Sequence, residues 1–116
     1  ALGSKNEIKA YKIAQYFADN PKDNPMVVTT SLVFSFFIKL LKYHGLKDKN
    51  PKNVASVLGV SPFFLKDYDV ALKNYPMRKV SQIVGSLREI DVKSKGVGAS
   101  LPVSDLLREM LYKIFN

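Results

Sequence analysis

The sequence predicts an all-α fold, a compact bundle of about five to six helices. Apolar residues recur at three- and four-residue steps along most of the chain, which is the spacing of one helix face. The 116 residues, 47% hydrophobic and 24% charged, suffice for one compact domain with its own core. We therefore assign residues 5–116 to a single helical domain and interpret residues 1–4, Ala-Leu-Gly-Ser, as a remnant of cloning.

Proline and glycine divide the chain into helical pieces. Proline suits the first helical turn, where its missing N–H has no intrahelical partner, and glycine readily adopts the left-handed conformation that ends a helix. The prolines that open helical runs are Pro25, Pro51, Pro62, Pro76 and Pro102. Asn24, Asn50 and Ser61 precede three of these prolines as N-caps, and the glycines that follow runs are Gly45, Gly59 and Gly96.

Residues 7–19 are predicted to form the first helix, which is amphipathic because lysines occupy the face opposite its apolar residues. The apolar face comprises Ile8, Tyr11, Ile13, Ala14, Phe17 and Ala18.

Residues 26–44 are predicted to form the central and most buried helix. The segment is apolar almost all round, with a narrow polar stripe at Ser31, Ser35, Lys39 and Lys42. A strand over residues 27–34 is the competing interpretation, since valine and threonine are β-branched, but no other segment looks like its partner in a sheet. The run is also shorter than the about 20 apolar residues of a membrane-spanning helix, so we expect no membrane segment.

Four further helical segments lie downstream. Residues 51–58 form a short helix, and residues 62 to about 74 form the next, with an inward face of Phe64, Leu65, Tyr68, Ala71, Leu72 and Tyr75. Residues 76 to about 92 present Val80, Ile83, Val84, Leu87 and Ile90 to the core. Residues 102–115 present Leu106, Leu107, Met110, Leu111 and Ile114.

No set of side chains in this sequence has the arrangement of a catalytic, cofactor or metal site. The single histidine, His44, precedes a glycine at a predicted helix end, where it interacts with the helix dipole. Asp67 and Asp69 lie two residues apart and point away from each other on a helix, while Asp105 and Glu109 share an exposed face with basic neighbours. The glycines around residues 96–98 lack the third glycine of a dinucleotide-binding loop. We therefore expect no enzymatic activity, no cofactor and no metal in this chain.

The net charge favours an acidic partner, nucleic acid above all, but its distribution along the chain weakens that expectation. Eighteen basic and ten acidic residues give a formal net charge of +8, but the basic excess is spread over both halves of the chain. The chain has no cysteine, which is compatible with a reducing cytoplasm, and no secretion signal is visible, so we expect a cytoplasmic protein.

Residues 53–65 have the pattern of a helix-turn-helix, a motif of many DNA-binding proteins. Ala55 is small where two helices would cross, Gly59 lies at the turn, and Val60 and Leu65 would fix the second helix. A DNA-reading helix begins with polar or basic residues, whereas this one begins Pro62-Phe63-Phe64. Structural packing is therefore the favoured interpretation, and a helix-turn-helix DNA-binding domain is the alternative.

The same segment, taken together with the residues downstream of it, resembles the C-terminal part of the delta subunit of bacterial DNA polymerase III, the subunit that opens the sliding clamp. Residues 54–68, VASVLGVSPFFLKDY, are similar to a family pattern of alanine, leucine-glycine-valine, proline-phenylalanine, lysine and tyrosine. Residues 87–96, LREIDVKSKG, resemble the family's helix end with an aspartate and a lysine-glycine, and the Leu106-Leu107 helix also fits. In order and spacing the resemblance extends from about residue 7 to residue 116.

This resemblance implies a helical collar domain without a reaction of its own. In the family, the C-terminal domains of five clamp-loader subunits pack into a ring that holds their AAA-type modules together during DNA replication. The implied partners are the other clamp-loader subunits through the collar, and the sliding clamp and primer-template DNA through the parent protein. The resemblance carries over scaffold residues only, so it assigns no partner-binding residue here.

Overall fold

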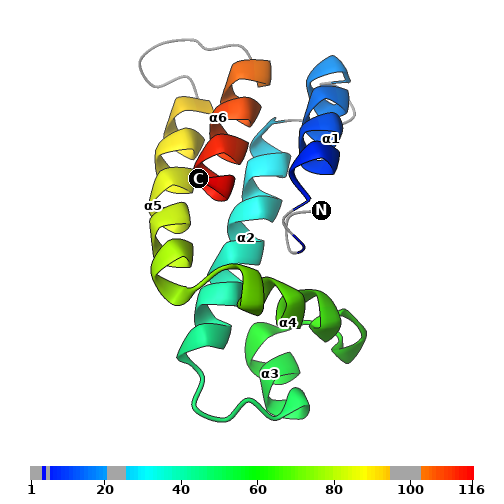
Figure 1. Cartoon of the computed structure of the whole chain (residues 1–116), viewed down its shortest axis with the longest axis vertical. Helices are drawn as coiled ribbons and strands as arrows, with labels where there is room; N and C mark the ends of the chain where they lie inside the picture. The colour runs from blue at the N-terminus through cyan, green and yellow to red at the C-terminus, as the bar shows by residue number, and fades with distance from the viewer. Residues whose placement is uncertain (1–3, 5, 21–25, 95–102) are drawn as a thin grey trace.

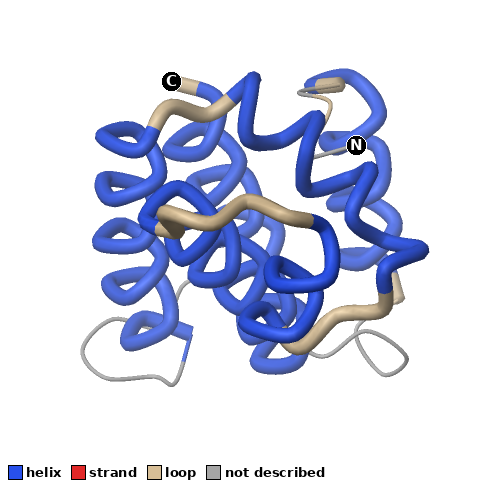
Figure 2. Tube along the Cα trace, turned by 90° about the horizontal axis from the view of Figure 1, so that it is seen from below, coloured by secondary structure: helices blue, strands red, loops and turns tan. Residues whose placement is uncertain are grey.

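The computed structural model of this chain describes residues 4, 6–20, 26–94 and 103–116. Its elements are α1 (Glu7–Asp19), α2 (Met26–Gly45), α3 (Pro51–Leu58), the 3-10 helix η1 (Pro62–Phe64), α4 (Leu65–Asn74), α5 (Met77–Ser94) and α6 (Val103–Phe115). Within these residues every regular element is helical (Figure 1, Figure 2). The predicted all-α fold is therefore confirmed, and residues 27–34 lie in a helix instead of a strand.

The ends of the shorter helices follow from polar side chains and one glycine. The Asn6 Oδ1 accepts a hydrogen bond from the Lys9 backbone N–H at 3.1 Å, and the Asn50 Oδ1 accepts one from the Lys52 N–H at 3.1 Å. Gly59 ends α3 with φ +67°, in the left-handed region that favours glycine. The predicted boundary residues Asn24, Pro25, Gly96 and Pro102 lie outside the described residues.

The larger hydrophobic core joins α1, α2, α5 and α6 with the end of α4. In Figure 1, α2 runs through the middle of the molecule, and it packs along α5 while α6 packs on both α5 and α1. All ten side chains predicted to face inward from α5 and α6 are buried in this core. The buried members from the other elements are Ala10, Ala14, Phe37, Leu40, Ala71 and Tyr75.

A second, smaller core lies at the end of the molecule formed by α3 and α4. Its buried members are Tyr43, Val54, Ala55, Leu58, Leu65 and Tyr68. Phe36 of α2 connects the two cores, because its ring stacks on Tyr68 at 5.1 Å and meets the edge of Phe37 at 5.2 Å between ring centroids. The molecule is accordingly elongated, with extents of 44 × 25 × 24 Å.

Two of the faces predicted from periodicity are partly wrong. Ile8 of α1 is 73% exposed, and Ala10, which lies outside the predicted apolar face, is buried. Helix α1 meets α6 through its small residues, since alanines let two helices approach closely, and that contact turns Ile8 toward solvent. Phe64 is 52% exposed, because the chain from Pro62 to Phe64 is a 3-10 turn that ends before the buried face of α4 begins at Leu65.

Candidate interaction surfaces

His44 has a structural position at a helix end, in agreement with its predicted placement. Its Nε2 donates a hydrogen bond of 2.6 Å to the backbone carbonyl oxygen of Tyr75. The carbonyl belongs to the residue that follows α4, so the imidazole ties the end of α2 to the end of α4. This partner lies 31 residues away along the chain, and no local pattern points to it.

The carboxylates are dispersed over the molecule. The Tyr43 hydroxyl donates a hydrogen bond to the Asp69 carboxylate, while Asp67 and Asp105 are exposed. Burial, together with the hydrogen bond and the charge of Asp69, raises the pKa of Tyr43 to about 12. Beside Asp105, Arg108 donates to the Gln15 side-chain oxygen at 3.4 Å and so connects α6 to α1. Among the described residues no group of three or more histidine or acidic side chains is arranged to hold a metal ion.

Two exposed phenylalanines lie side by side just before α4. Phe63 is 84% exposed and Phe64 is 52% exposed, and their rings meet edge to face with centroids 5.4 Å apart. The Ser61 hydroxyl accepts a hydrogen bond from the Phe63 N–H at 3.3 Å, which holds the turn that presents both rings. We call these two residues the aromatic tip. The two rings form a small exposed apolar patch, a feature that a partner protein can cover.

The outward face of α4, which would read DNA in a helix-turn-helix, carries both signs of charge. Lys66, Asp67, Asp69 and Lys73 are all exposed. The two carboxylates would repel the phosphate backbone, and no basic cluster at the start of the helix compensates for them. This surface is better suited to a mixed protein contact than to base recognition.

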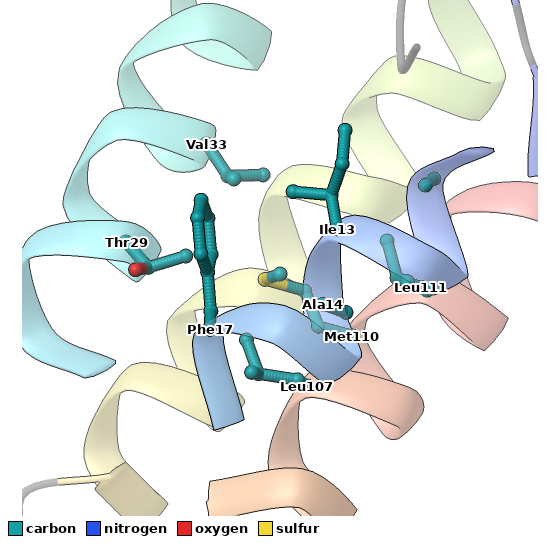
Figure 3. Close-up of a pocket in the computed structure, with 9 residues that line it drawn as sticks. Ile13, Ala14, Phe17, Thr29, Val33, Leu107, Met110 and Leu111 are labelled. Carbon is teal, nitrogen blue, oxygen red and sulfur yellow. The ribbon is translucent and has the colours of Figure 1, made fainter. Parts of the chain in front are cut away.

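A second apolar surface lies between α1 and α2 (Figure 3). It is a hollow of about 90 Å³ whose walls are Ile13 and Phe17 of α1 and Thr29 and Val33 of α2. Its floor is made by Ala10, Ala14, Leu107, Met110 and Leu111. We call it the α1–α2 groove. Sequence periodicity places Ile13 and Phe17 on a core-facing side, and Ile13 is in fact 39% exposed at the edge of this groove.

No helix in the described part of the chain has the length and apolar character needed to cross a membrane. Comparison with family models, curated proteins and solved structures found no match to this chain. The function is therefore inferred from the sequence pattern and from the two surfaces.

Proposed function

We propose that this chain is an assembly module, the C-terminal oligomerisation (collar) domain of a DNA polymerase III delta subunit. In that role it holds clamp-loader subunits together while the sliding clamp is loaded during DNA replication. The proposal joins the resemblance of residues 54–68 and 87–96 to a helical fold of the expected kind. It assigns the module no reaction of its own.

One observation carries the proposal, namely that the chain exposes two apolar surfaces on separate parts of the molecule. The aromatic tip belongs to the α3–α4 end. The α1–α2 groove belongs to the part formed by α1, α2, α5 and α6, which we call the four-helix part. A module inside a ring meets one neighbour on each side, so it needs two different surfaces. Two exposed apolar surfaces are expected of such a module, whereas a domain that contacts only water has no need of them.

The alternative, a helix-turn-helix DNA-binding domain, is favoured by the net charge of +8. A diffuse positive surface gives weak, sequence-independent binding that falls steeply with salt. The mixed charges on α4 and its phenylalanine-rich start argue against sequence-specific binding.

Co-purification tests the proposal directly. The chain would be mixed with the other clamp-loader subunits at about 150 mM ionic strength, where exposed charges more than ~8 Å apart are largely screened. In parallel it would be titrated with duplexes of different sequence. We expect retained binding to the subunits and negligible preference among duplexes. Tight binding to one duplex that is lost when a base is changed would overturn the proposal.

A further inference from the structure

The α1–α2 groove lies where α1, which packs on α6, faces the N-terminal half of α2. Ala10 and Ala14 are the buried residues of α1, and the rings of Tyr11 and Phe115 add a contact to α6 at 6.3 Å between centroids. Figure 3 shows the Ile13 and Val33 side chains directed into the gap from opposite helices. The groove is therefore a gap between α1 and α2, and side chains of α6 form much of its floor.

Apolar side chains continue outward from the walls of the groove onto both rims. Tyr16, three residues after Ile13, is 58% exposed on α1, and Leu32, next to Val33, is 67% exposed on α2. Val28, one turn before Leu32, is 52% exposed. An apolar gap with apolar rims is the kind of surface that the apolar stripe of an amphipathic helix covers.

The charges near the rims are basic on both helices. Lys9 lies one turn before Ile13 on α1, and Lys39 lies two turns after Leu32 on the same face of α2. Among the residues that the structure describes, no charged side chain lines the groove.

Of the two carboxylates of α1, Asp19 is hydrogen-bonded and Glu7 lies near Tyr75. Asp19 accepts a hydrogen bond of 3.0 Å from the Gln15 side chain, which in turn meets Arg108 on the α6 side. Glu7 is close enough to Tyr75 for its charge to add to the effect of burial in raising the pKa of that phenol. The groove thus has an apolar centre and a positive border, and its complement is an apolar stripe with negative flanks.

We propose that the α1–α2 groove binds an amphipathic helix of a neighbouring subunit, with apolar residues at positions i, i+3, i+4 and i+7 and with glutamates or aspartates flanking them. The helix lies across the mouth of the groove, its apolar stripe over Ile13 and Val33 and its carboxylates near Lys9 and Lys39. That the helix belongs to a clamp-loader subunit rests on the proposed function. The chemistry of the groove does not depend on it.

A matched pair of synthetic helices tests this inference on the intact chain. Both peptides carry the same leucine stripe, flanked by glutamates in one and by lysines in the other. NMR would follow the methyl groups of Ile13, Leu32 and Val33 during each titration at about 50 mM salt. We expect the glutamate peptide to shift these methyls and the lysine peptide to bind at least about tenfold more weakly, because the charge contacts reverse sign.

Two variants test whether the peptide binds at the α1–α2 groove. Leu32→Ser changes an exposed side chain on the rim and should weaken the glutamate peptide about tenfold, whereas Val92→Ser, also solvent-facing on α5, should not. Equal affinities for both peptides, no methyl shifts up to about 1 mM peptide, or methyl shifts confined to α3 and α4 would overturn the inference. Failure of the chain to co-purify with clamp-loader subunits would remove the proposed function instead, and the peptide titration would still decide the groove.

Discussion

The four-helix part of the molecule and its α3–α4 end each have a hydrophobic core, but the two cores are built from different kinds of contact. The larger core is mostly aliphatic around the buried rings of Phe37 and Tyr75, and long helices close it on several sides. The smaller core uses two tyrosines among six buried residues, and it depends on a glycine turn, a 3-10 turn and one long-range hydrogen bond. The difference indicates that the larger core supplies most of the stability, while the α3–α4 end is held by a few specific contacts.

The largest expected effect comes from a charge placed in either core. Leu87→Asp puts an unpaired carboxylate where the side chain has no exposure, at a cost on the order of 4 kcal/mol or more, and should unfold the whole chain. Leu58→Asp should disrupt α3 and α4 while amide protection in α5 and α6 persists. For both variants, circular dichroism measures the loss of helix and hydrogen exchange measures amide protection in each helix. If the Leu58 variant lost protection in every helix at once, the two cores would be a single cooperative unit.

A smaller effect should follow from the Tyr43–Asp69 hydrogen bond. Tyr43→Phe removes a bond to a partly solvated carboxylate and should cost about 1 kcal/mol. The raised pKa of Tyr43 means that the folded state favours the protonated phenol, whose contribution is complete below pH 10 and is lost as the pH rises through about 12.

The melting temperature as a function of pH checks this prediction. It should fall over that interval in the wild type and fall less in Tyr43→Phe. A residual fall is expected, because burial also raises the pKa values of Tyr68 and Tyr75. Identical pH profiles for the two proteins would contradict the role assigned to this bond.

Two glycines should respond to alanine with opposite signs. Gly59 has a positive φ, so Gly59→Ala should destabilise the α3–α4 end by about 1 kcal/mol, although no atom stands in the way of the new methyl group. Gly85 lies inside α5 with open space around it, so Gly85→Ala should stabilise the chain by about 0.5–1 kcal/mol. Chemical denaturation of both variants gives the two values, and equal signs would refute the comparison.

The structural features that could be predicted from the sequence are those that depend on residues close together along the chain. The bounds of α1 and α3 and the inward faces of α5 and α6 follow from capping residues and from helical spacing. Sequence reasoning misses what depends on which helix meets which: the small Ala10 at a close helix contact, the outward turn of Phe64, and the His44–Tyr75 bond. Periodicity identifies an apolar face, but it does not say whether another helix of the same chain covers it. For that reason neither interaction surface could be assigned in advance.

The predicted inward position of Phe64 would make a polar substitution there destabilising, but its observed exposure leads to the opposite expectation. A polar residue there should leave the fold intact, because the ring is already half in water. The aromatic tip can therefore be altered without disturbing the cores.

The most direct test of the proposed assembly role is the binding of clamp-loader subunits by a variant of the aromatic tip, Phe63→Ser with Phe64→Ser. Val70→Ser, at an exposed position of α4, is the matched control. Both variants should keep the wild-type melting temperature to within the equivalent of about 0.5 kcal/mol. At about 150 mM ionic strength the tip variant should bind the subunits at least about tenfold more weakly, and the control should bind as the wild type does. Equal binding by all three proteins, or no binding by the wild type, would contradict the account.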